Sequence, residues 1–435
     1  MLEISTDASA KDNETEISTE RNCFYGDLNE NITPEFLIRF TQAVTSSLSP
    51  EAKILLSLSD EPDNLMIKFA LLAGLIAGGS EAYNLVDSGN RNVAKFTLQK
   101  YPLDAGIHVQ IHGSQIRLEI LDQKGNPADS DFMDNIKERL LSGCFRRTET
   151  KHFLPPVNVN KMPLHYFKDL VTTTCSKRLK FTVVICTSCS ETQRLFKKIG
   201  AAFGITVLFT NDEDTLPRFI IDNQADLGIL IGTNGKFGFL DEHGHIMNGD
   251  TYYGLVTLMV LSADSNGKVL MPQHASGITE EIAESCGGAV VRVAEQDMEP
   301  NLIDADTPTA RLQYELCFDP VRAMIRICEF LYLNQCSLSY VCNLLPVMYK
   351  ISRNVDCPTE KKGKVMHKLL SELRLDASTK LSDGIKIVNG HDWVLIIPDA
   401  KDGKINIVSE SHDAETANEI AGDICRAIAT FIKEH

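Results

Sequence analysis

The chain has 435 residues, more than a single compact core accommodates, so roughly two to four domains are expected. Hydrophobic residues make up 43% and charged residues 23%, which is ordinary for a soluble globular protein. The formal net charge of −16 would repel a phosphate backbone, and nucleic acid is therefore excluded as a general partner.

Neither a membrane span nor a secretion signal is expected. No segment reaches the roughly 20 apolar residues that a membrane helix needs, and the nearest candidate, residues 65–79, contains Lys68. Residues 1–20 are polar and acidic, which predicts a disordered lead-in rather than a signal peptide. The 12 cysteines lack framework spacing, so we expect reduced thiols and a cytoplasmic protein. We interpret the CxxC of Cys186 and Cys189 as two small buried or capping residues, with a redox pair as the alternative.

The first part of the chain alternates predicted strands and helices. The hydrophobic pattern predicts strands over residues 53–59, 81–86, 107–111 and 116–121, and helices over 65–77 and 132–141. The last two strands are joined by the short link His112–Gln115, so we expect them to be neighbours in one sheet.

The alternation of predicted strands and helices is repeated in two further units after Pro155 and Pro156, and a tail with a different order follows. A second unit has predicted helices over 164–171 and 191–202, and strands over 180–185, 205–209 and 227–231. A third has predicted strands over 268–271 and 289–293, and helices over 279–285 and 318–332. The tail has predicted helices over 360–373 and 414–432, and strands over 384–388, 393–397 and 404–408. Three similar units and a different tail predict a repeated α/β module followed by a small α+β domain.

Seven segments carry a further signal. They are ITPEFLIRF (32–40), LLAGLIAGGSEAYNL (71–85), DAGIHV (104–109), ADLGILI (225–231), FLDEHGHIMNGD (239–250), CGGAVVRV (286–293) and LSDGIKIVNGHDWVLIIPD (381–399). Each resembles a framework segment of the phosphohexomutases, the phosphomannomutase/phosphoglucomutase superfamily, in the expected order. The resemblance implies an α/β fold of three repeated domains and a C-terminal α+β domain, TATA-binding-protein-like, around a central cleft.

The resemblance also implies domain limits. The lead-in would be 1–20, and domains I to IV would be 21–150, 151–260, 261–352 and 353–435. The C-terminal part, with VDCPTEKKGKVMHKLL and LIIPDAKDG, is most similar to the mutase-like region of some bacterial mannose-1-phosphate guanylyltransferases.

The first family loop carries the phosphoserine that exchanges a phosphoryl group with the sugar. In the family, DAGI and two apolar residues are followed by Thr-Ala-Ser-His-Asn-Pro. The ungapped match places His112 at the phosphoserine position, with Ser114 two places further on. The residues here predict a tightened turn between strands, and a nucleophile at Ser114 or His112 is the alternative.

The second family loop, Asp-Gly-Asp-Gly-Asp-Arg, binds Mg²⁺ through carboxylates. Residues 232–236 read Gly-Thr-Asn-Gly-Lys here, one residue shorter and without a carboxylate. We therefore expect no metal and no cofactor. Lys236 aligns with the family's arginine and is a candidate phosphate or sugar contact, with a solvated turn lysine as the plainer reading.

The last two family loops bind the sugar and its phosphate. The third would lie within Asp304–Leu316, which contains Glu315 but no Gly-Glu-Glu-Ser-Gly-His-type sequence. The fourth, Arg-Pro-Ser-Gly-Thr-Glu-Pro in the family, matches Ile397–Gly403. Lys401 and Lys404 are candidate phosphate contacts there, and a polar hairpin loop is the alternative.

Four altered loops predict a pseudoenzyme of phosphohexomutase fold that binds a sugar phosphate or acts as a regulatory or interaction subunit in carbohydrate metabolism. One alternative is an active phosphomannomutase/phosphoglucomutase, an isomerase that works by intramolecular phosphotransfer, with divergent loops. Another is a purely structural scaffold. The expected partners are a sugar phosphate and either a protein or a second copy of the chain, with neither nucleic acid nor membrane.

Overall fold

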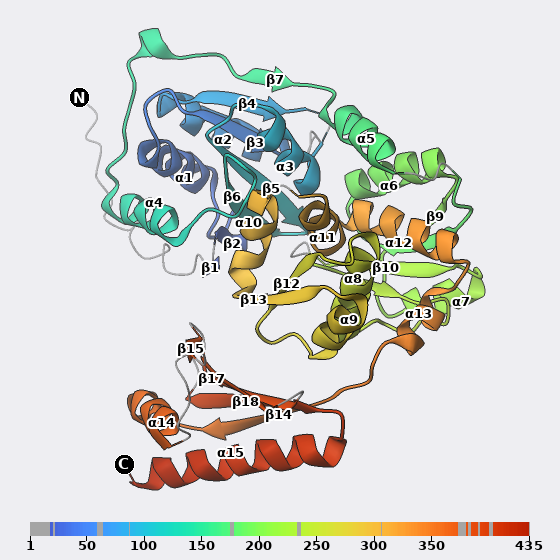
Figure 1. The fold of residues 1–435 in the computed structure, drawn as a ribbon. Coiled ribbons are helices and arrows are strands. Elements are labelled where there is room, and N and C mark those ends of the chain that lie inside the picture. Colours follow the sequence, from blue (N-terminus) through green and yellow to red (C-terminus); the bar gives the residue numbers. More distant parts are fainter. Residues whose placement is uncertain are drawn as a thin grey trace. The chain divides into compact units, whose positions relative to one another are not determined.

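The structure is a computed structural model that describes residues 18–20, 22–58, 64–86, 88–174, 178–232, 236–305, 307–372, 380–381, 384–389, 392–399 and 403–434. Contacts divide the chain into two compact units. Unit 1 comprises Met1–Gly244 and Phe318–Leu333, and unit 2 comprises His245–Cys317 and Asn334–His435. Figure 1 shows the elements of both units.

Unit 1 contains a seven-stranded sheet in the order β1-β2-β6-β5-β3-β4-β7. Its strands are β1 (Ser18–Glu20), β2 (Cys23–Asp27), β3 (Lys53–Ser57), β4 (Glu81–Leu85), β5 (Ala105–His112), β6 (Gln115–Asp122) and β7 (Val157–Val159). Strands β3, β4, β5 and β7 are parallel, whereas β6, β2 and β1 join antiparallel. The chain crosses β3 on its way from β4 to β5, so helices cover both faces of the sheet.

Three helices pack on one face of this sheet, namely α1 (Pro34–Ser47), α2 (Leu65–Ala77) and α4 (Ser130–Ser142). Their apolar side chains form one buried core with alternate strand residues such as Ile54, Leu56 and Ile107. Helix α3 (Arg91–Lys100) lies against the other face. A Cβ at Gly106 would come within 2.8 Å of Leu98 Cδ1, so glycine permits the close approach of α3 to β5.

A separate four-stranded sheet in unit 1 has the order β11-β10-β8-β9. Its strands are β8 (Thr182–Cys186), β9 (Thr206–Thr210), β10 (Leu227–Ile231) and β11 (Phe237–Leu240), and its helices are α5 (Met162–Thr173), α6 (Ser190–Phe203) and α7 (Leu216–Asp222). Helix α12 (Pro320–Asn334) comes from much later in the chain and contacts α5. The Tyr166 hydroxyl donates to Asp319 Oδ2 at 2.6 Å, and Arg322 Nη2 donates to Asp169 Oδ2 at 2.8 Å.

Unit 2 contains two sheets. A parallel pair is formed by β12 (Lys268–Pro272) and β13 (Ala289–Val293), accompanied by α8 (Gly249–Ala263), α9 (Ile278–Cys286), α10 (Glu295–Ala305), α11 (Pro308–Phe318) and α13 (Leu338–Leu344). An antiparallel sheet has the order β14-β18-β17-β16-β15. It consists of β14 (Tyr349–Asp356), β15 (Lys380–Leu381), β16 (Gly384–Asn389), β17 (Asp392–Pro398) and β18 (Lys404–Ser411), and it shares a core with α14 (Thr359–Glu372) and α15 (Ala414–Glu434).

The predicted fold class is confirmed: α/β layers are followed by an α+β tail. Two details differ from the prediction. Ser18–Glu20 form β1 inside the predicted lead-in, and β14 precedes the helix that was expected to open the tail. Helix α8 crosses the predicted limit at 260, and β14 crosses the one at 352, so the exact domain limits stay a prediction. None of the described helices is both long and apolar enough to cross a membrane.

Candidate functional site

The first loop position is a two-residue hairpin turn. His112 and Gln115 are paired across β5 and β6, so only Gly113 and Ser114 connect the strands. Gly113 has a φ of 61°, the value that a type II′ turn requires at its first central residue. The Ser114 hydroxyl donates to Asp27 Oδ1 at 2.9 Å, and the Ser114 carbonyl accepts from the Leu28 N–H at 2.7 Å. The turn is therefore tied to the end of β2.

His112 is the last residue of β5 and is half-buried. Burial lowers the pKa of its imidazole below the ordinary value. A neutral imidazole can act as a nucleophile, but its place in a paired strand limits how far it can move toward a substrate. His112 and Ser114 thus lie together on one hairpin, as the sequence predicts, in a tightened turn.

A buried polar network lies further along the same two strands and was missed by sequence reasoning. Arg91 of α3 donates to both carboxylate oxygens of Glu119 on β6, each at 2.6 Å. Burial by itself raises the pKa of Glu119, but Arg91 and then Lys95 more than offset this and hold that pKa well below its usual range. The only available sequence signal was the pair of charged residues, Arg117 and Glu119, inside the apolar run IRLEIL.

His108 belongs to the same network. Its Nδ1 lies 3.1 Å from the Ser57 hydroxyl, and both side chains are fully buried. No hydrogen-bond partner of His108 Nε2 is found within the described part of the chain. Burial lowers the pKa of His108 to about 4, so the imidazole is neutral at pH 7. These groups fill the α3-facing side of the sheet beside the hairpin.

The second loop position joins the antiparallel strands β10 and β11. The Gly232 N–H donates to the Lys236 carbonyl at 2.8 Å, which closes the loop at its base, and the Lys236 side chain is exposed. Thr233, Asn234 and Gly235 lie outside the described residues. Residues 232–236 offer no carboxylate, so they do not fit Mg²⁺, which prefers carboxylate oxygens. Across the described residues, no group of three or more His, Cys, Asp or Glu side chains is placed to hold a metal.

The third loop position is helical. Residues 308–318 form α11, so the stretch expected to hold a sugar-binding loop instead packs as a helix. Glu315 is buried and pairs with Arg311 at 3.4 Å. Gln313 is fully buried, and its amide accepts from the Leu270 N–H at 3.0 Å and donates to the Leu270 carbonyl. Gln313 thereby completes the hydrogen bonding of β12 at the edge away from β13.

The fourth loop position joins β17 to β18. The Asp399 N–H donates to the Lys404 carbonyl at 3.0 Å, which closes a hairpin loop, and the Lys404 side chain is exposed. Lys401 lies outside the described residues. Lys362 of α14, which sequence reasoning missed, donates from Nζ to the Asp399 carbonyl at 2.5 Å. Lys362 and Lys404 therefore bring two cations to the base of this loop.

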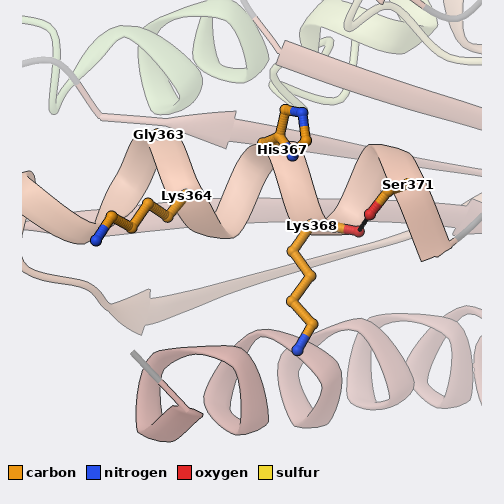
Figure 2. A pocket seen from close by; sticks show the side chains of 5 residues that line it. All are labelled: Gly363, Lys364, His367, Lys368 and Ser371. Carbon is orange, nitrogen blue, oxygen red and sulfur yellow. Dashed lines mark hydrogen bonds between the residues drawn. The ribbon is translucent and has the colours of Figure 1, made fainter.

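A hollow of about 410 Å³ lies on α14 (Figure 2). It is lined by Gly363, Lys364, His367, Lys368 and Ser371. The spacing of these residues places them on one helix face. Figure 2 shows the Lys368 side chain extending toward α15, where its Nζ lies 4.7 Å from the centre of the Phe431 ring. The hollow is basic but open, and a single helix lines it.

No protein-family model matches the chain. The chain is 21% identical over 440 residues to a "probable phosphoglucosamine mutase" of Pyrococcus horikoshii, with 94% of this chain and 96% of the relative covered. It is 22% identical over 456 residues to a phosphopentomutase of Thermococcus kodakarensis, with 94% and 97% covered. Its fold is similar to that of a phosphoglucomutase/phosphomannomutase family protein from Burkholderia thailandensis, with a TM-score of 0.77, 14% identity, and 94% and 96% of the two chains covered.

The chain is thus similar over nearly its whole length to proteins named as sugar-phosphate mutases, and similar in fold to a phosphoglucomutase/phosphomannomutase family protein. The relatives match it along nearly their whole length, which agrees with the order of the framework segments in the sequence. The more specific likeness of the C-terminal part to the guanylyltransferase region stays a prediction.

Proposed function

We propose that this phosphohexomutase-superfamily protein binds a phosphosugar without transferring its phosphoryl group by the family's serine mechanism. The observation that carries the proposal is the two-residue turn Gly113–Ser114 at the phosphoserine position. A nucleophile must reach in-line contact with a phosphate while cations neutralise the charge that develops. Ser114 lies instead in a tight two-residue turn, and its hydroxyl donates to the carboxylate of Asp27.

The second loop supports the same proposal. Phosphoryl transfer in this family uses a divalent ion, and residues 232–236 contain no carboxylate to hold one. The exposed Lys404 at the fourth loop can attract a phosphate group by charge, and the buried Lys362 adds positive charge at the base of the same loop. Together these groups support the binding of a phosphosugar without turnover. We place this function in carbohydrate metabolism, in the cytoplasm.

An active phosphohexomutase is the second candidate, and the names of the relatives favour it. Proteins named as mutases of phosphoglucosamine and phosphopentose match this chain almost end to end. In that case Ser114 or His112 would carry the phosphoryl group. A scaffold that binds no ligand, whether alone, with a protein partner or as a homo-oligomer, is the third candidate.

The test is to incubate the pure protein with Mg²⁺, glucose 1,6-bisphosphate and either mannose 1-phosphate or glucosamine 6-phosphate. We expect neither an isomerised product nor a phosphoprotein in the intact mass. Product or phosphoprotein that disappears in Ser114→Ala or His112→Ala, but not in the control Ser142→Ala, would establish the active mutase instead.

A binding measurement separates the remaining two candidates. We expect calorimetric titration with mannose 1-phosphate to give a binding signal that weakens in Lys404→Met and Lys362→Met. The absence of a calorimetric signal with mannose 1-phosphate, glucosamine 6-phosphate and glucose 1,6-bisphosphate would favour the scaffold.

A further inference from the structure

The loop between β12 and α9 is organised by three cations. Five successive carbonyl oxygens, those of residues 272–276, accept hydrogen bonds from basic side chains. Arg292 of β13 donates to the first, fourth and fifth, Lys386 of β16 to the second, and Lys350 of β14 to the third, at 2.8–3.1 Å. Lys386 and Lys350 come from the C-terminal sheet, so two of the three cations join this sheet to the loop.

A carboxylate from the same sheet lies where the loop ends. Glu410 of β18 is only 1% exposed, and its Oε1 accepts from the Gly277 N–H at 2.6 Å. Gly277 is the N-cap residue of α9, where a negative charge is favoured by the exposed N–H groups and the helix dipole. The Trp393 indole Nε1 donates to the same oxygen at 2.8 Å. Two neutral donors therefore converge on one buried carboxylate oxygen.

The pairing of the strands places these groups on one face of the sheet. Lys350 is directly opposite Glu410, and Glu410 is directly opposite Trp393, on three neighbouring strands. Lys350 Nζ lies 3.9 Å from Glu410 Oε2 and 2.6 Å from Asp250 Oδ2 on α8. Lys386 Nζ lies 4.3 Å from the centre of the Trp393 ring. The row thus contacts α8, the 272–276 loop and the N-cap residue of α9 at the same time.

We propose that Glu410 is a latch: its carboxylate, inserted at the start of α9, holds the C-terminal sheet on the β12–α9 loop in the absence of any ligand. The protein's own carboxylate takes the place that an external anion would otherwise occupy at a helix start flanked by cations. His412 Nε2, on an exposed side chain, lies 2.6 Å from Oε1 of the partly buried Glu281 and adds a contact between the two parts. The latch does not depend on whether the protein turns over a phosphosugar.

Trp393 is the only tryptophan in the chain and is 4% exposed, so its fluorescence reports on the latch directly. In Glu410→Ala we expect stronger quenching of Trp393 by acrylamide, because the residue loses its acceptor and the contact that covers it. Amides near the start of α9 should exchange hydrogen about tenfold faster or more, as expected for loss of a buried hydrogen bond to a charged group. The matched control Glu415→Gln removes an exposed charge a few residues away and should match wild type.

A second variant removes the other half of the contact without touching the C-terminal sheet. Gly277→Pro deletes the donor N–H, and the φ of −62° at this position suits proline. We expect the same rise in Trp393 quenching as in Glu410→Ala, with unchanged hydrogen exchange in the β14–β18 ladder. The latch is refuted if acrylamide quenches Trp393 in both variants no more than in Glu415→Gln. It is also refuted if hydrogen exchange rises in β14–β18 together with that in α9, because Glu410 would then only stabilise its own sheet.

Discussion

The buried ion pair of Arg91 and Glu119 gives the sharpest test of how the hairpin at the first loop position is supported. The Glu119 side chain is 5% exposed and receives two hydrogen bonds from Arg91 at 2.6 Å. Arg91→Met leaves this carboxylate buried without its main partner, a change that costs about 3–5 kcal/mol. Because globular domains are stable by roughly 5–15 kcal/mol, the free energy of unfolding should fall by a third or more.

The assay is urea unfolding followed by far-ultraviolet circular dichroism, with three variants. The double variant Arg91→Met/Glu119→Met removes both charges and should recover most of the loss, since apolar replacement of a whole buried pair is often nearly neutral. Lys137→Met removes the exposed pair with Asp134 and should cost less than about 1 kcal/mol. If Arg91→Met costs no more than Lys137→Met, or if the double variant is as unstable as the single one, the Arg91–Glu119 pair does not have this role.

Two further predictions follow from the buried polar residues. The pKa of His108 is about 4 in the folded protein, against an ordinary value of 6.5. Between these two pH values the unfolded state binds more protons than the folded state. The free energy of unfolding should therefore fall as the pH drops from 6.5 to 4, by up to about 3 kcal/mol. Unfolding free energies measured across this range should show a flatter slope for His108→Gln, and equal slopes would contradict the assignment. Gln313→Leu leaves the Leu270 N–H and carbonyl without their partner and should cost about 1–3 kcal/mol for each group, with faster hydrogen exchange in β12. Gln99→Leu, at an exposed position of α3, is the control, and equal losses in the two variants would rule out the role of Gln313.

The elements that the sequence predicted well are those with strong apolar patterns. Helix α2 was expected over 65–77 and lies there, and β10 was expected over 227–231 and lies there, because both are runs of apolar residues bounded by polar ones or glycine. The strands β5 and β6 were expected to stop at Ile111 and start at Ile116, yet they pair as far as His112 and Gln115. The hydrophobic pattern alone does not predict that polar residues next to a turn, such as His112 and Gln115, still belong to the paired strands.

The contacts that shape the candidate site could not be read from local pattern. Gln313 and Leu270 are 43 residues apart, Lys362 and Asp399 are 37 apart, and Gly277 and Glu410 are 133 apart. Each is a polar side chain whose role depends on a backbone group brought to it by the fold. Polar residues with such roles look like surface residues in a single sequence, since burial and partner are tertiary properties.

A binding site holds polar groups whose hydrogen-bond partners are supplied by the ligand. Without the ligand, such unpaired groups lower the free energy of unfolding of the protein. At two of the family's loop positions the described polar groups bond within the protein instead: Ser114 donates to Asp27, and Gln313 bonds the edge of β12. Away from these positions, Glu410 occupies the start of α9. The fourth loop differs, because Lys404 is exposed and offers a charge that a phosphate group can reach, whereas Lys362 is buried and donates to the Asp399 carbonyl. We therefore expect the phosphate of a bound phosphosugar to lie at the β17–β18 loop rather than at the hairpin, so Lys404→Met should weaken binding while Ser114→Ala leaves it unchanged.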